Sequence, residues 1–347
     1  MASLTQPPRV TLVGAGMISH VQILPSLYQL QRIGIIGDIH VCDARARTVR
    51  ELAESTALRA AFPGHAFTPH PDYSSVPGDA ADPDLHKAVF ADAPRGSIAA
   101  IAVPDQFHYP IVREALANDL HVMVVKPLVL THAQAEEIAA IARDRALVVG
   151  VEYHKRFDYR ALLARQKYRA GLLGEFRTAQ AQMIEPYYYY NSNFQNWCTC
   201  ENTDMFTYVG CHYVDQVAFI TGLRPVAVSV YGIVDTYPNG NKGFLWTDGR
   251  VLWENGAVLS VTDSMGYPNA GPGGNFQGLA MWGKGNGDAT LLVHSDQYRG
   301  TKHCYTEAGT APGDTVYVEP SLDYFTLLDM GGGGLTPVGY GFRSIED

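Results

Sequence analysis

The first 155 residues alternate short apolar runs with stretches of helical spacing, and this alternation limits the fold more than any other feature. The runs bounded by breaks are residues 9–16, 39–43, 97–104, 121–130 and 148–153. Strands that alternate with helices form a parallel sheet with helices on both faces. The sequence therefore predicts an α/β architecture for the N-terminal part, with a Rossmann-type parallel sheet. Residues 62–94, rich in Pro, Asp and His, are expected to form a loop-rich connection.

The pattern changes after about residue 155. Longer alternating stretches such as VAVSVYGIV (226–234) follow one another, and a single helix is expected around 203–220. Strands in succession are typical of a largely antiparallel sheet. We therefore predict a dinucleotide-binding domain over residues 1–127 and a C-terminal α+β domain over 128–347, with an open sheet for substrate binding and oligomerisation. A last helix begins in GFRSIED, at the end of the chain.

Composition excludes several classes of protein. The net charge of −9 over 347 residues argues against a nucleic-acid binder, whose domain is normally basic. No run of about 18 apolar residues is present, so no membrane span is expected. The first residues, MASLTQPPRV, lack the pattern of a signal peptide, and five cysteines are an odd number for a disulfide framework. These features predict a cytoplasmic enzyme with reduced thiols.

A glycine motif lies between the first strand and the first helix. Gly14 and Gly16 would allow a tight turn and let a pyrophosphate approach the backbone above a helix N-terminus. Ser19 replaces the third glycine, which weakens the motif, although serine is small enough for helix–strand packing. Two further residues of the same turn, Met17 and Ile18, are predicted to contact the cofactor.

Asp43, at the end of the second strand, is the acidic partner that this motif requires. A carboxylate at this place accepts hydrogen bonds from ribose hydroxyls and repels a 2′-phosphate, so we predict NAD as the cofactor. Arg45 and Arg47 lie close enough in sequence to leave NADP open. The alternative is that Asp43 only caps the following helix.

Five stretches together resemble one known family. They are VGAGMIS, IAVPDQFHYP, VVKPL, VGVEYHKRFDYRALLARQKYRAGLLGEF and YVGCHYVDQVAFITG, in this order over about the first 225 residues. They are similar to motifs of the glucose–fructose oxidoreductase/inositol dehydrogenase/rhizopine-catabolism (Gfo/Idh/MocA) family. The resemblance implies a nicotinamide-binding domain followed by an open-faced mixed sheet, oxidation of a sugar or polyol, and a homo-oligomer formed through that sheet. The chain departs from the family where Val125 precedes the lysine and where Tyr208 replaces an aspartate.

Lys126 ends a strand whose residues are otherwise apolar. In an open parallel sheet, ligands bind at the carboxyl ends of the strands, and an ammonium group there can polarise a substrate hydroxyl. Pro127 fixes the backbone that follows, and the resemblance makes a cis Lys–Pro bond an expectation. We predict that Lys126 is catalytic and touches both substrate and cofactor, with Pro127 beside the cofactor. A surface lysine is the alternative.

Tyr208 and His212 are four residues apart, so a helix would place both on one face. His212 is predicted to act as the general base for the hydroxyl proton and Tyr208 as a hydrogen-bond donor, both in contact with substrate. Asp215 can accept one imidazole N–H and so set the tautomer. Gly210, which is costly within a helix, predicts close approach by another part of the chain. The alternative for His212 is a half-buried histidine with only structural contacts.

Several other positions are weaker candidates. By the resemblance, Pro104 and His108 lie near the nicotinamide of the cofactor. Lys155 and Arg156 follow the strand that leads into the second domain and could bind cofactor or substrate; we take Arg156 as a cofactor candidate, and Tyr153 and Lys155 as substrate candidates. An exposed loop histidine and solvated charges explain His108, Lys155 and Arg156 nearly as well. Two residues of the stretch YYYYNSNFQNW, Tyr187 and Asn193, offer an apolar ring face and an amide for a sugar, although packing or a subunit contact explains them almost equally.

A zinc site formed by Cys198, Cys200, Cys211 and His212 has unfavourable C-x-C spacing, and no bound metal is expected. The sequence thus favours an NAD(P)-dependent dehydrogenase for a sugar, polyol or glycoside. Redox-neutral glycoside cleavage by oxidation and elimination is a second hypothesis, and a non-catalytic nucleotide-binding protein is a third.

Overall fold

The computed structural model describes residues 6–78, 80–271, 274–295, 303–305, 316–318, 324–329 and 334–347. The chain forms two compact units, one of Met1–Glu152 with Phe325–Asp347 and one of Tyr153–Tyr324. The predicted boundary between residues 127 and 128 therefore differs from the structure in two ways: the first unit continues to Glu152, and it also includes the C-terminal segment. The strand over Val149–Glu152 pairs in parallel with that over His121–Val125, so the first sheet continues to Glu152. The C-terminal segment packs into the core of the first unit, where Phe342 is buried.

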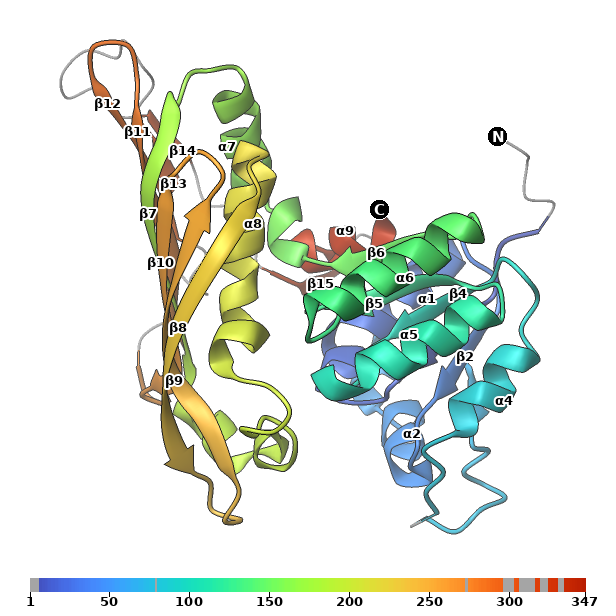
Figure 1. Cartoon of the computed structure of the whole chain (residues 1–347). Coiled ribbons are helices and arrows are strands. Elements are labelled where there is room, and N and C mark those ends of the chain that lie inside the picture. The colour runs from blue at the N-terminus through green and yellow to red at the C-terminus, as the bar shows by residue number, and fades with distance from the viewer. Residues whose placement is uncertain are drawn as a thin grey trace. The chain divides into compact units, whose positions relative to one another are not determined.

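The first unit has the predicted parallel sheet, with the strand order β3-β2-β1-β4-β5-β6. Figure 1 labels β2, β4, β5 and β6 of this sheet. Its strands are β1 (Val10–Val13), β2 (Ile39–Cys42), β3 (Thr68–His70), β4 (Ile98–Ile101), β5 (His121–Val125) and β6 (Val149–Glu152). Its helices are η1 (Ser19–Ile23, a π-helix), α1 (Leu24–Arg32), α2 (Ala46–Ala53), α3 (Thr56–Ala61), α4 (Leu85–Ala91), η2 (Asp105–Phe107), α5 (His108–Ala117), α6 (His132–Asp144) and α9 (Tyr340–Glu346). A two-stranded ribbon of β15 (Thr326–Asp329) and β16 (Leu335–Val338) precedes α9.

Apolar side chains of the first sheet enter two separate cores. One core combines β1 and β2 with α1 and α9, and includes Leu12, Leu27 and Phe342. The other combines β4 and β5 with α4 and α5, and includes Ile101 and Val112. Helices cover both faces, as a doubly wound Rossmann sheet requires. This confirms the fold class predicted for the N-terminal part.

The stretch 62–94 holds more regular structure than its composition predicted. It contains β3 at the edge of the sheet and the seven-residue helix α4. Pro69 lies in the middle of β3, and proline within a run argues against a strand except at a sheet edge. Three residues with a central proline give too little pattern to identify the strand from sequence.

The second unit is built on an eight-stranded sheet with the order β14-β13-β12-β11-β7-β10-β9-β8. Its strands are β7 (Glu175–Pro186), β8 (Pro225–Thr236), β9 (Lys242–Trp253), β10 (Val258–Tyr267), β11 (Phe276–Lys284), β12 (Ala289–His294), β13 (His303–Tyr305) and β14 (Val316–Val318). Its helices are η3 (His154–Phe157), α7 (Tyr159–Arg169), η4 (Tyr187–Asn191), η5 (Asn193–Asn196), η6 (Phe206–Gly210, a π-helix) and α8 (Cys211–Thr221). Among the described strands of this sheet, only β7 and β10 pair in parallel, so the sheet is mixed and mostly antiparallel, as predicted.

Helices α7 and α8 lie on one face of this sheet (Figure 1). Ala164 of α7 and Val217 of α8 share a core with alternate residues of the strands, including Ala179 and Val261. No helix covers the opposite face in the part of the chain that the structure describes. Trp246, on that side, is 37% exposed. The alternation of buried and exposed residues along β9 follows from this one-sided packing.

Candidate functional site

The glycine turn after β1 requires the absence of a side chain at its first position. Gly14 has φ of +103°, and a Cβ there would lie 2.1 Å from the carbonyl oxygen of Ala102. A Cβ at Gly16 would meet nothing within 4 Å, so the backbone there is open to a ligand. Ser19 is fully buried, and its hydroxyl donates to the Gly14 carbonyl at 2.6 Å. The serine in the third glycine position therefore holds the turn closed by a hydrogen bond. The neighbouring Met17 is exposed, and Ile18 is partly buried.

Asp43 connects this turn to the next helix. Its Oδ2 accepts from the backbone N–H of Ala15 at 2.9 Å. Its Oδ1 accepts from the N–H of Arg45 at 2.9 Å and from the hydroxyl of Thr48 at 2.7 Å. Asp43 is not the N-cap of α2, which is Arg45, although its bonds to Arg45 and Thr48 hold the start of that helix. The cofactor role stays compatible with its position, since a carboxylate offers about four acceptor sites. Arg47 forms an ion pair with Glu51.

Lys126 follows the last residue of β5 and is partly exposed. The Lys126–Pro127 bond is cis, as the resemblance implied. The Pro127 carbonyl lies 2.7 Å from Nδ1 of His108, whose Nε2 lies 2.8 Å from the carbonyl of Val103. His108 has no exposed surface. The structure therefore corrects the interpretation of His108 as an exposed loop residue: its ring is buried and connects the loops after β4 and β5.

His212 lies in the first turn of α8 and is 2% exposed. Its imidazole ring packs among aromatic rings of the second unit. The His154 ring is centred 4.7 Å from it and the Tyr153 ring 6.2 Å from it. His154, which also contacts Tyr324, was missed in the sequence. The only signal for it was its place in HKRFD, directly after a strand of the parallel sheet. Burial raises the pKa of Tyr153, and Cys211 acts in the same direction.

Asp215 does not accept a hydrogen bond from His212 as predicted; both of its oxygens accept from Arg156 instead. The guanidinium Nε donates to Oδ2 at 2.7 Å, and a second N–H donates to Oδ1. Burial raises the pKa of Asp215, while the Arg156 hydrogen bonds act against that shift. Arg156 also stacks on Tyr153 and Phe219, so its first role in the structure is to hold η3 against α8.

Glycine is unfavourable within a helix, so Gly210 predicted a close neighbour, and the structure has one. A Cβ at this position would lie 2.5 Å from Oδ2 of Asp263 on β10. Asp263 has no exposed surface, and neither of its carboxylate oxygens has a hydrogen-bond partner among the described residues. Burial raises its pKa well above the usual range, and Asp204 and Glu185 raise it further. Asp263 is the second residue that sequence analysis missed, because a single Asp in an alternating strand is normally exposed.

Tyr208 lies in the π-helical turn η6, where a helical turn is wider than in an α-helix. The spacing of four residues to His212 therefore does not establish a common face. The Tyr208 ring packs edge-on against Phe194 and Trp197, each at 5.2 Å, whereas His212 contacts Tyr153 and His154. Tyr208 and His212 therefore pack against different aromatic residues, although they belong to one continuous helix.

Of the remaining candidates, Lys155 is buried, 3% exposed, and donates to Oε1 of Gln277 at 3.0 Å. Its ammonium group lies over the Tyr213 ring, so it supports α8. Tyr187 and Asn193 are exposed, and Pro104 is partly exposed at the end of β4. Among the described residues, no group of three or more His, Cys, Asp or Glu side chains has a metal-binding arrangement. In the same part of the chain, no helix has the length and hydropathy of a membrane span.

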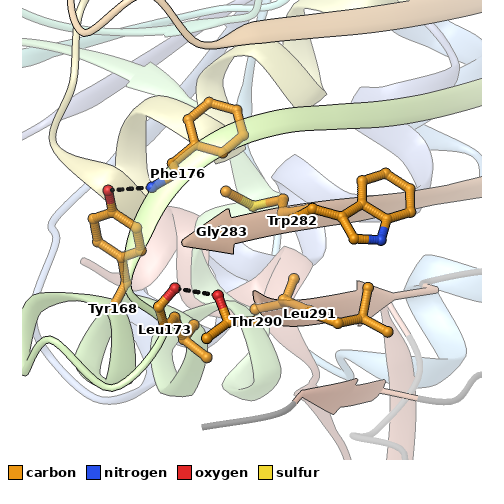
Figure 2. A pocket seen from close by; sticks show the side chains of 9 residues that line it. Tyr168, Leu173, Phe176, Trp282, Gly283, Thr290 and Leu291 are labelled. Atoms are coloured by element: carbon orange, nitrogen blue, oxygen red, sulfur yellow. Dashed lines mark hydrogen bonds between the residues drawn. The ribbon is translucent and has the colours of Figure 1, made fainter. Parts of the chain in front are cut away.

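A small pocket elsewhere in the second unit carries no such chemistry. Figure 2 shows it between the end of α7 and strands β11 and β12. Tyr168 accepts from the N–H of Phe176 at 3.3 Å, and Thr290 donates to the carbonyl of Leu173 at 2.5 Å. None of its nine lining residues is acidic, basic or a histidine. The polar atoms of Tyr168 and Thr290 form hydrogen bonds to the backbone of the second unit.

The glycine turn, Asp43 and the doubly wound sheet define the first unit as the nucleotide-binding part of an oxidoreductase. Residues 8–153 match the family described as an oxidoreductase family with an NAD-binding Rossmann fold, Gfo/Idh/MocA. This match of the N-terminal segment agrees with the resemblance seen in the motifs and with a nicotinamide nucleotide as the predicted cofactor.

Two curated relatives are sugar enzymes. The chain is 24% identical over 233 residues to D-glucoside 3-dehydrogenase of Escherichia coli, a match that covers 65% of this chain and 57% of that one. It is 32% identical over 149 residues to dTDP-3,4-didehydro-2,6-dideoxy-alpha-D-glucose 3-reductase of Streptomyces antibioticus, covering 39% of this chain and 44% of that one. The matches thus span about half the length of these relatives.

Solved structures share the fold of nearly the whole chain. An inositol dehydrogenase homologue of Azotobacter vinelandii, solved with NADH and myo-inositol, superposes with a TM-score of 0.70 at 20% identity, covering 98% of this chain and 84% of that one. A UDP-N-acetylglucosamine 3-dehydrogenase of Acidithiobacillus ferrooxidans superposes with a TM-score of 0.64 at 16% identity, covering 98% and 87%. At these identities the likeness supports the fold.

Proposed function

We propose that this protein is a dehydrogenase that oxidises a secondary alcohol of a sugar, polyol or glycoside. When bound, NAD accepts the hydride from the carbinol carbon. The observation that carries the proposal is Lys126, a partly exposed lysine at the carboxyl end of β5, where ligands of such sheets bind. The related enzymes act on glucosides and on nucleotide-linked sugars, which supports a carbohydrate as the substrate.

The residues of the first unit fit the nucleotide. The open backbone at Gly16 and the close packing of Gly14 on Ala102 would hold the pyrophosphate above the start of η1. Asp43 would accept the ribose hydroxyls, which favours NAD over NADP. We expect Asp43→Ala to raise the KM for NAD more than the KM for NADP. An unchanged ratio of the two KM values would contradict this assignment.

The proton of the substrate hydroxyl is assigned to His212. In the proposed reaction, His212 accepts that proton while the Lys126 ammonium stabilises the developing alkoxide, and Tyr208 donates a hydrogen bond to the sugar. His154 and Tyr153, whose rings contact His212, would hold the imidazole in place. Arg156 neutralises Asp215, so that Asp215 is not available as a competing base on α8.

Substitution of Lys126 tests the proposal directly. An absorbance screen at the NADH band with sugars, inositols and glycosides would first identify a substrate. Lys126→Ala should then lower kcat by about 10²- to 10⁴-fold with little change in the Kd for NAD. His212→Gln should lower kcat similarly, and Tyr208→Phe should lower it less. Turnover by Lys126→Ala close to that of the wild type would overturn the proposed function.

We also propose that the protein forms a homo-oligomer through the face of the second sheet that no described helix covers. On this face the edge strand β8 exposes Tyr231 (80%) and Ile233 (66%), which lie opposite Asp248 and Trp246 of β9. Beside Tyr231, Asp248 and Arg250 line a shallow depression, and a twofold axis would let each meet its opposite charge. Exposed apolar strands of this length are normally covered.

Light scattering tests this association. Ile233→Arg should lower the molar mass to that of one chain, whereas Ile35→Arg, at an exposed position of the first unit, should leave the mass unchanged. An oligomer that persists in Ile233→Arg, or a wild-type protein that is monomeric, would contradict the proposal.

A further inference from the structure

A fully buried glutamine lies on the helix that follows the glycine turn. Gln22 has no exposed surface and belongs to η1, which continues directly into α1. Its Nε2 donates to Oε1 of Glu152 at 2.9 Å and to the carbonyl of Gly341 at 2.8 Å. The Ser344 hydroxyl, at 3.3 Å, is a third acceptor for the same nitrogen. Three acceptors on one side of the amide determine which way it points. We call these four residues the Gln22 network.

Glu152 is the acidic member of the network. It ends β6 and is 4% exposed. In the parallel register it pairs with Val125 of β5, so it lies at the carboxyl edge of the sheet, where ligands bind. The Ser344 hydroxyl also donates to its Oε1 at 2.6 Å. Since Ser344 belongs to α9, one carboxylate oxygen connects η1, β6 and α9, and all three elements are parts of the first unit.

Packing alone does not require this polar group. The Oε1 atom of Gln22 is buried and has no hydrogen-bond partner among the described residues. A buried acceptor without a partner destabilises a fold, and apolar side chains of similar volume often replace buried polar partners without loss of stability. Hydrogen bonds are directional, however, and a connected buried network holds its members in one arrangement. The Gln22 network therefore fixes the position of η1 at some cost in stability.

The position of η1 matters because the glycine turn depends on the same helix. The Ser19 hydroxyl donates to the Gly14 carbonyl at 2.6 Å, and the N–H of His20 donates to the Gly16 carbonyl at 3.2 Å. The helix is thus attached to the turn through Ser19 and to β6 and α9 through Gln22. A pyrophosphate binds to the backbone N–H groups at such a helix start, so a shift of the helix changes the directions of these donors.

We propose that Gln22, Glu152 and Ser344 are positioning residues for the cofactor, and that α9 is thereby a part of the nucleotide-binding site. They act through η1 rather than through a contact with NAD. The inference rests on the proposed function, in that the first unit binds NAD. It extends the site to a segment that the glycine motif does not indicate, since Gly341 is 319 residues from Gln22 in the sequence.

Paired apolar substitutions separate positioning from packing. In the double variant Gln22→Leu with Glu152→Leu, both polar partners become apolar, so the free energy of unfolding should stay close to that of the wild type. The Kd for NAD, measured by titration calorimetry on the full chain, should nevertheless rise by about tenfold, a loss equivalent to one hydrogen bond. The kcat at saturating NAD should change by less than about twofold, because only cofactor binding is affected.

Two further variants complete the test. Ser344→Ala removes the hydroxyl of α9 from the network and should raise the Kd for NAD by about twofold to threefold. Arg32→Leu is the matched control, since Arg32 joins α1 to the same C-terminal segment by donating to the carbonyl of Leu335 at 3.0 Å. It lies at the other end of the continuous helix from the glycine turn, so the Kd for NAD should not change.

A stable double variant that binds NAD like the wild type would show that the network only packs the fold, and would overturn the proposal. If the double variant does not fold, an unchanged Kd in Ser344→Ala overturns it instead. An equal rise in Kd in Arg32→Leu would also overturn it, because any loosening of the C-terminal segment would then suffice. NAD binding that depends on Gln22 and Glu152, in a protein that oxidises no sugar, polyol or glycoside, would retain the positioning role and overturn the proposed function.

Discussion

The glycine turn of the first unit and the Gly210 contact of the second unit bury polar side chains in different ways. In the first unit, the buried Ser19 hydroxyl donates to the glycine turn, and the buried His108 ring lies against two backbone carbonyls. In the second unit, Asp263 is equally buried, but its carboxylate has no hydrogen-bond partner among the described residues. A buried acceptor without a partner costs about 1–3 kcal/mol. The Ser19 hydrogen bond therefore stabilises the glycine turn, whereas the unpaired Asp263 carboxylate destabilises the part of the second unit around it.

Asp263 lies next to the helix that carries the proposed base, His212. The carboxylate lies directly against Gly210, which ends the π-helical turn and stands two residues before His212. Turns of π-helix and unpaired buried groups are both concentrated at functional elements. The glycine turn is closely packed, and its buried Ser19 hydroxyl is hydrogen-bonded. The helix that carries the proposed base, His212, instead packs against a buried carboxylate without a hydrogen-bond partner among the described residues, which costs free energy.

The largest expected effect is at the rigid turn. Gly14→Ala would place a Cβ 2.1 Å from a backbone oxygen at a φ of +103°, and we expect a loss of more than about 3 kcal/mol in the free energy of unfolding. Gly16→Ala is the matched control because its Cβ meets no atom, so it should weaken only NAD binding. Urea unfolding and NAD titration separate the two effects. A stable Gly14→Ala that binds NAD would show that the turn is not closely packed.

The next effect tests the contact in the second unit. Alanine in place of glycine normally stabilises a helix by about 0.5–1 kcal/mol. Because its Cβ would lie 2.5 Å from Asp263, Gly210→Ala should instead destabilise the protein by about 1–3 kcal/mol. The double variant Gly210→Ala with Asp263→Ala should recover most of the loss. If unfolding experiments show that the two effects simply add, the contact does not limit position 210.

The contrast between the units also explains what the sequence could predict. The parallel sheet, the glycine turn and Lys126 at the strand end are set by local patterns, and the structure has all three. The need for close approach at Gly210 was visible for the same reason, since glycine within a helix has a known cost. Each of these expectations rests on residues close together in the chain, although the residue that approaches Gly210, Asp263, could not be named from them.

Features that depend on distant pairs were not predictable. Asp215 was expected to face His212, but its partner is Arg156, 59 residues away in sequence. The domain boundary failed likewise, because apolar residues such as Phe342 do not show which sheet they will cover. Asp263 looked like an ordinary strand residue. In each case the partner is chosen by the tertiary fold, and spacing carries no information about it.

Asp263 should also make stability depend on pH. Its folded-state pKa is raised by burial, so the unfolded chain ionises first as the pH rises above about 3.8. Stability from the neutral form is present below that pH and is lost as the pH rises toward the folded pKa. Asp263→Asn removes this loss and should be more stable than the wild type at pH 8 by about 1–2 kcal/mol, with a smaller difference at pH 4. Thermal melts at the two values test this. A difference that does not change with pH would show that the carboxylate finds a partner on ionising.

The smallest effect belongs to a histidine pair at the edge of the first sheet. His40 Nδ1 and His70 Nε2 lie 2.8 Å apart, and burial, followed by Arg9, lowers the pKa of His40 to about 4. The unfolded chain binds the proton more readily, so stability should be lost as the pH falls from about 6.5 to about 4. Both rings are partly exposed, so we expect less than about 1 kcal/mol. His40→Gln should reduce the slope of stability against pH in this window only, opposite in sign to the Asp263 effect. Chemical unfolding at pH 5 and pH 7 measures it, and an unchanged slope would assign the acid sensitivity to other groups.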